Sequence, residues 1–98
     1  MHALRELIRE TDLRLLSGTF VKETHADKGA RLDQHAHVYA HVSVIVRGRV
    51  RLYAGGRYVG DYKAPAGLYI AAVMRHQFVI LEDDTIILCV HDMDAEVV

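Results

Sequence analysis

The chain has 98 residues, of which 51% are hydrophobic, so it is long and apolar enough for one folded domain and is not intrinsically disordered. Twelve Lys and Arg residues nearly balance thirteen Asp and Glu residues, and this balance gives no net field that would attract nucleic acid or an anionic membrane. No apolar run approaches the roughly 20 residues that a membrane helix needs, and the charges of Arg5 and Arg9 interrupt any signal-peptide core. The single cysteine, Cys89, cannot form an internal disulfide, which fits a reducing compartment. We therefore expect one domain over residues 1–98, in the cytoplasm, without nucleic-acid or membrane partners.

The N-terminal apolar residues recur at helical spacing. Leu4, Leu7 and Ile8 lie at i, i+3 and i+4, which predicts a short amphipathic helix over residues 2–10, inside an N-terminal helix or arm of residues 1–12.

The rest of the chain shows the period of β-strands. Short apolar or alternating runs, separated by turn residues, are typical of an all-β barrel or sandwich. The expected strands are a first pair between Leu13 and Thr24, then 42–46, 50–52, 58–63, 68–72, 77–81 and 85–91. The expected turns are 26–29, a Gly-Gly hairpin at 55–56, 65–67 and 82–84.

Histidine is the unusual component, because three of the seven histidines lie between residues 34 and 41. His35 and His37 are two residues apart, so on an extended segment both point to one face. His41 follows past a kink or bulge and can rejoin that face, and His76 can add a fourth imidazole from across a barrel. Three or four converging imidazoles form a site for Zn, Fe, Mn, Ni or Cu. The alternative is that each histidine is a surface residue or is hydrogen-bonded separately, since ligation needs several converging donors.

The histidine spacing resembles the first motif of the cupin superfamily, G-x5-H-x-H-x3–4-E-x6-G. Gly29, His35, His37 and Gly48 stand where the motif requires them, and His41 takes the place of the usual glutamate. Small single-domain cupins with an all-histidine site show a similar replacement.

A second segment resembles the later cupin motif in altered form. Residues 70–78 read IAAVMRHQF, which is similar to I-P-A-G-V-P-H-x-F. Ala71 and Val73 replace the proline and the glycine that set the turn, whereas His76 keeps the ligand position. The resemblance covers roughly residues 18–92.

A weaker likeness connects the chain to short cupin-like proteins carried by phages and prophages. That likeness rests on residues 48–51, 64–65 and 84–85.

The cupin resemblance implies a fold and a metal site. The fold is a double-stranded β-helix, a jelly-roll barrel, over residues 18–92, preceded by the short N-terminal helix. The implied ligands of a divalent metal ion are His35, His37, His41 and His76. Iron or manganese is favoured by the resemblance to cupin dioxygenases, with zinc or nickel possible because they bind imidazole more tightly.

The same resemblance implies a small metal-dependent oxygenase or dioxygenase that acts on a chelating, oxygen-rich small molecule. Four neutral imidazoles leave the full charge of +2 on the ion, which favours anionic or bidentate oxygen ligands. A non-catalytic cupin that binds a small ligand or a protein partner is the alternative.

Two residues near the expected site have an open role. His91 shares a strand face with Ile87 and Cys89, so it is either a group at the barrel mouth or a histidine satisfied near a strand end. Tyr39 lies between two expected ligands and either reaches the pocket or packs outside it. Cys89 is expected to be a core residue and not a nucleophile, because no base stands beside it in the sequence.

Two surface features complete the expectations. Four arginines at positions 47, 49, 51 and 57 predict a solvated basic sheet face. Residues 42–46 and 86–90 are apolar on both strand faces, and one barrel interior can bury only one of those faces. The other face must meet the N-terminal helix or another subunit, and we expect a homodimer.

Overall fold

The computed structural model describes residues 8–14, 18–34, 41–71 and 74–92, and this part of the chain consists of nine antiparallel strands and their connections. The strands are β1 (Ile8–Arg14), β2 (Thr19–Ala26), β3 (Arg31–Gln34), β4 (His41–Arg47), β5 (Arg49–Ala54), β6 (Arg57–Lys63), β7 (Ala66–Ile70), β8 (His76–Ile80) and β9 (Thr85–Asp92). Over these ranges there is no helix of the length and apolarity that would span a membrane.

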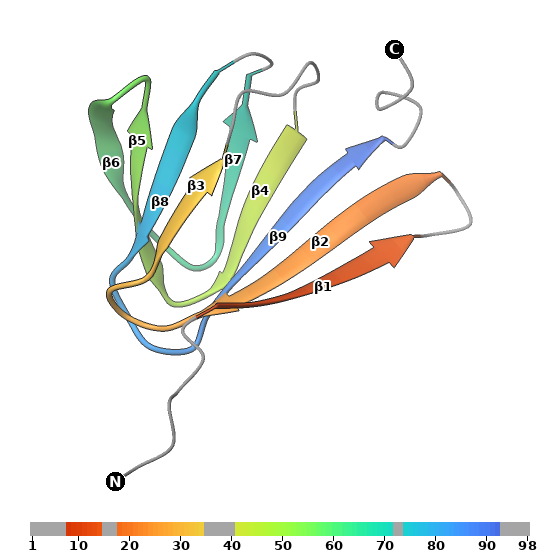
Figure 1. Ribbon diagram of the computed structural model, residues 1–98, viewed down its shortest axis with the longest axis horizontal. Helices are drawn as coiled ribbons and strands as arrows, with labels where there is room; N and C mark the ends of the chain where they lie inside the picture. Colours follow the sequence, from red (N-terminus) through yellow and green to blue (C-terminus); the bar gives the residue numbers. More distant parts are fainter. Residues whose placement is uncertain (1–7, 15–17, 35–40, 72–73, 93–98) are drawn as a thin grey trace, which may run out of the picture.

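The strands form two sheets, as the sequence predicted for an all-β jelly roll. One sheet has five strands in the order β1-β2-β9-β4-β7, and the other has four in the order β3-β8-β5-β6. Figure 1 shows the two sheets facing each other, with β1 and β2 splayed away from the four-stranded sheet. Most neighbours in both sheets, such as β2 and β9 or β3 and β8, are distant in sequence, which is the jelly-roll arrangement expected from the cupin resemblance.

Alternating side chains explain which face of each strand is buried. In β8 the residues at positions 76, 78 and 80 are buried and the two between them are half-buried. In β4 the buried positions are 41, 43 and 45. Every second residue of β4 and β8 therefore points to the inner face of its sheet. In both strands the first inward residue is a histidine.

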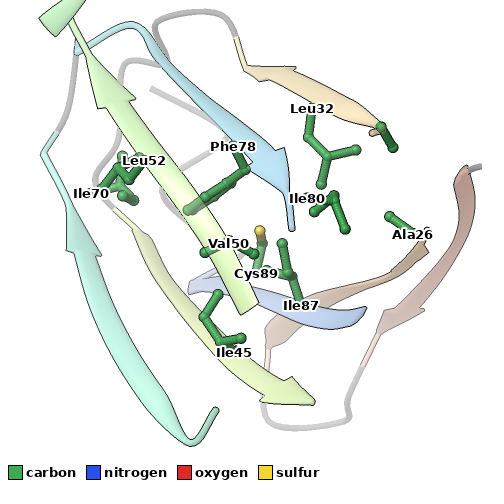
Figure 2. Close-up of a cluster of buried hydrophobic side chains, with 11 residues drawn as sticks. Ala26, Leu32, Ile45, Val50, Leu52, Ile70, Phe78, Ile80, Ile87 and Cys89 are labelled. Atoms are coloured by element: carbon green, nitrogen blue, oxygen red, sulfur yellow. The ribbon is translucent and has the colours of Figure 1, made fainter. Parts of the chain in front are cut away.

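The apolar core lies between the two sheets, below these histidines. Figure 2 shows the aliphatic side chains of both sheets around Phe78, which is completely buried. The core members are Ala26, Ala30, Leu32, Ile45, Val50, Leu52, Ile70, Phe78, Ile80, Ile87 and Cys89. Cys89 thus belongs to the core, as the sequence predicted.

Three details differ from the sequence prediction. The helix expected over residues 2–10 is wrong where it can be compared, because Ile8 opens β1, which pairs with β2 along its whole length. The turn expected at 65–67 lies at Ala64–Pro65, since Ala66 already begins β7. The strand β3 was not predicted, because it has only four residues, three of them charged or polar.

Candidate metal centre

Two of the four predicted ligands lie side by side. His41 opens β4 in one sheet and His76 opens β8 in the other, and their side chains point between the sheets. The residues are 6% and 3% exposed, and the ring centroids are 5.4 Å apart with an interplanar angle of 43°. Two imidazoles that share one ion at about 2.1 Å from each nitrogen have ring centres roughly 5 Å apart. The ring spacing of the pair is therefore compatible with a shared metal ion.

The ring of His76 is held by two contacts. Its Nδ1 lies 3.3 Å from the carbonyl oxygen of Met74, and when Nδ1 carries the proton it donates a hydrogen bond to that oxygen. Phe78 packs against the ring at 5.7 Å and 84°. A backbone carbonyl on Nδ1 leaves Nε2 as the nitrogen with the lone pair, which is the usual arrangement of a metal-binding histidine.

The strand register fixes which residues surround the pair. His41 pairs with Ile70 on β7, and His76 pairs with Ala54 on β5 and with Gln34 on β3. All five positions lie at the same end of the two sheets. In chain order, residues 35–40 follow Gln34, the strand partner of His76, and precede His41.

The other expected site residues are outside the described residues. His35, His37 and Tyr39 all fall in the segment 35–40. Within the ranges that the structure covers, no group of three or more His, Cys, Asp or Glu side chains could hold a metal ion. The metal site consequently rests on one observed pair and on two ligands that remain predictions.

The inner wall beside His41 carries Ser43, which the sequence analysis did not single out, and His91, whose role the sequence left open. Ser43 is completely buried, and its hydroxyl lies 3.4 Å from the Cys89 sulfur. His91 packs against Phe20 with ring centroids 4.9 Å apart and an angle of 38°. The alternation that starts from His41 would have identified Ser43 as an inward residue, whereas nothing in the sequence pairs Phe20 with His91.

Arg49 and Arg51 lie on β5 of the four-stranded sheet and have acidic neighbours, whereas Arg47 ends β4 of the other sheet. The Arg51 guanidinium donates hydrogen bonds of 2.8 and 3.1 Å to the Asp61 carboxylate, and Arg49 lies 3.6 Å from Glu82. The hydrogen bonds from Arg51 hold the pKa of the Asp61 carboxyl below its usual range. The arrangement agrees with the solvated face that the sequence predicted.

No protein-family model matches the sequence, and no curated protein matches it. Solved structures do resemble it. A cupin 2 domain-containing protein from Halorhodospira halophila has a TM-score of 0.75 at 20% identity, over 89% of this chain and 65% of that one, so the chain spans less than two thirds of its length. A cupin superfamily protein from Desulfitobacterium hafniense has a TM-score of 0.76 at 12% identity, over 96% of this chain and 84% of that one. The Cupin_2 domain of an XRE family transcriptional regulator from Enterobacter cloacae has a TM-score of 0.74 at 11% identity, over 87% and 95%.

Proposed function

Because the chain has the cupin fold, we propose that it binds one divalent metal ion through His35, His37, His41 and His76, and uses the ion to bind a small oxygen-rich molecule. The observation that carries this proposal is the buried His41–His76 pair, whose rings face each other from opposite sheets at 5.4 Å. When bound, the ion supplies Lewis acidity and open coordination positions for a chelating oxygen ligand. Iron or manganese is the favoured ion, and zinc or nickel is possible.

Chain connectivity supports the inclusion of His35 and His37. Residue 35 directly follows Gln34, the strand partner of His76, and an extended chain advances at most about 3.6 Å per residue. The α-carbon of His37 is therefore within about 11 Å of that of Gln34. His41 limits the segment from the other end. This chain length allows both histidines to reach an ion held by the observed pair.

Metal affinity is expected to fall steeply as the pH drops below about 6.5, the ordinary pKa of histidine. Each imidazole must be neutral to bind, so several protons compete with one ion, and the dependence is steeper than for a single titrating group. Equilibrium dialysis with Zn(II) over a pH series measures it. Bound metal that stays constant from neutrality down to about pH 4.5 would argue against a histidine site.

The leading reaction is oxygenation of the chelating molecule by a dioxygenase. A reducing compartment such as the cytoplasm is the proposed location, because Cys89 is the single cysteine and cannot form an internal disulfide. The second candidate is a non-catalytic cupin that binds a small ligand or a protein partner. This candidate is supported by the similar Enterobacter domain, which belongs to a transcriptional regulator. Oxygen uptake by the iron-loaded protein with a panel of chelating hydroxy acids separates the two.

We further propose that the chain forms a homodimer through the outer face of the five-stranded sheet. The outer face of β9, β4 and β7 is apolar, with Val21 of β2 beside it, and its most exposed members are Tyr69 at 73%, Val46 at 48% and Val42 at 41%. Strand spacing and residue rise give the patch about 14 Å in each direction. That extent suits the apolar centre of a standard interface of roughly 800 Å² per partner. The outward apolar side chains are Val21, Val42, Val44, Val46, Tyr69, Ile86, Leu88 and Val90.

Substituting Val42 with lysine is expected to convert the dimer into a monomer, because the charge would lie between Tyr69 and Val90 in the apolar patch. Val59→Lys is the matched control, since Val59 is 48% exposed on β6 of the other sheet. Light scattering at micromolar concentration gives the mass, and circular dichroism confirms folding of both variants. A monomeric wild type, or a dimeric Val42→Lys variant, would contradict the proposed interface.

A further inference from the structure

The inner wall of the five-stranded sheet carries another histidine at the level of the proposed metal site. The pairing of β4 with β9 ends at Val42 and Val90, and His41 and His91 are the next residues of the two strands at this end. Alternation places both side chains on the inner face, His41 with Ser43 and His91 with Cys89. The strands β2, β9 and β4 are neighbours in this sheet (Figure 1), and Phe20 on β2 pairs with His91.

The orientation of the His91 ring is set by Phe20. Phe20 is buried on β2, pairs with His91 in the strand register, and its ring lies 4.9 Å from that of His91. Phe20 is not a member of the apolar core cluster, and in the described part of the chain its aromatic partner is His91. The half-buried imidazole is therefore packed against an aromatic wall in a defined place.

His91 stands beside the ion's ligands and does not complete their set. Among the residues with described positions, His41, His76 and His91 do not form a group that could hold an ion. A small molecule bound to the ion next to His41 would meet the His91 side chain as the next group along β9. An imidazole carries an N–H donor in its neutral form, so it can donate to such a molecule without a change of charge.

We propose that His91 is a specificity-determining residue that donates a hydrogen bond to an anionic oxygen or nitrogen ligand of the metal ion. The inference rests on the proposed function, because it takes a metal ion at the His41–His76 pair as given. It goes beyond that function because it states which small molecules bind best. His91 on β9 would favour ligands that have a second acceptor atom in addition to the atom that contacts the ion.

Azide binding to the Co(II)-loaded protein tests this assignment, because azide is a small anion with a distal acceptor and its binding changes the visible spectrum of Co(II). The measurement is made at one fixed pH above the histidine range. His91→Phe removes the donor and keeps a planar ring, and His91→Asn restores an N–H donor. His25→Phe is the matched control, because His25 lies on the outer face of β2 beside Glu23.

His91→Phe is expected to keep one Co(II) per chain and to bind azide about tenfold more weakly, the effect of losing one hydrogen bond to a charged group. His91→Asn is expected to recover most of the affinity, and His25→Phe to match the wild type. Unchanged azide affinity in His91→Phe overturns the inference. Loss of Co(II) from that variant also overturns it, since His91 would then be a ligand. A wild type that takes up no Co(II) refutes the proposed function together with it.

Discussion

Replacing His37 with alanine is expected to abolish tight metal binding, whereas His41→Glu is expected to keep it. Alanine removes one of the proposed donors and leaves no side chain at position 37 that could bind the ion. The affinity loss should exceed the roughly 10–100-fold cost of removing a group that only orients a ligand. Position 41 corresponds to the glutamate of the cupin motif, and the buried His41 ring is next to His76, so a carboxylate there reaches the same ion.

The two variants also differ in stability and chemistry. His41→Glu buries a carboxylate, which costs free energy unless a cation neutralises it. Its melting temperature should therefore rise more on metal addition than that of the wild type. The glutamate lowers the charge of the site by one unit and weakens binding of anionic ligands. Metal stoichiometry with thermal melts in the presence and absence of Zn(II) measures both, with His25→Ala as the surface control. Full metal content in His37→Ala would show that the proposed ligand set is wrong.

Replacing Gly48 with alanine is expected to destabilise the fold by about 2–5 kcal/mol. Gly48 connects β4 to β5, where the chain passes from one sheet to the other, with φ of +87°. A Cβ at this position would lie 2.8 Å from the Thr85 Cα and would overlap the Thr85 hydroxyl. The positive φ alone costs roughly 1–2 kcal/mol for a residue with a Cβ, and the overlap adds roughly 1–3 kcal/mol. The completely buried Thr85 is fixed by a hydrogen bond of 2.8 Å from its hydroxyl to the Glu82 carbonyl oxygen, so it cannot move aside.

Gly29→Ala is the matched control for this substitution. Gly29 has a similar φ of +93°, but a Cβ there would meet no atom within 4 Å. The control should lose about 1 kcal/mol, which lowers the melting temperature of a domain this size by roughly 4–8 °C. Gly48→Ala should lose at least about twice as much or fail to fold. Equal melting temperatures for the two variants would show that the contact with Thr85 does not constrain position 48.

The sequence predicted the strands whose apolar residues alternate. A strand that is buried on one face has an apolar residue at every second position, and this pattern can be read from the sequence alone. The sequence also predicted that His41 and His76 meet, although they stand 35 positions apart in the chain (76 − 41 = 35). That prediction depended on the cupin spacing, because no local pattern states which strand lies opposite another.

The errors have identifiable physical causes. The N-terminal apolar spacing favoured a helix, but Ile8 and the residues after it form an edge strand on β2, where pairing outweighs a weak helical pattern. The turn near Pro65 was placed too late because Gly67 suggested a turn, whereas it lies inside β7. Phe20 was not linked to His91 because their contact depends on β2 and β9 being neighbours, and they stand about 70 residues apart in the chain.

The most direct test of the central proposal is the metal content of the wild-type protein. The protein is purified without added chelator, its metals are measured by mass spectrometry, and the metal-free form is titrated with Fe(II), Mn(II), Zn(II) and Ni(II). We predict one ion per chain at saturation, with binding blocked when His35, His37, His41 and His76 are replaced together. A protein that binds no divalent ion, or binds it equally well after that replacement, would contradict the proposed metal site.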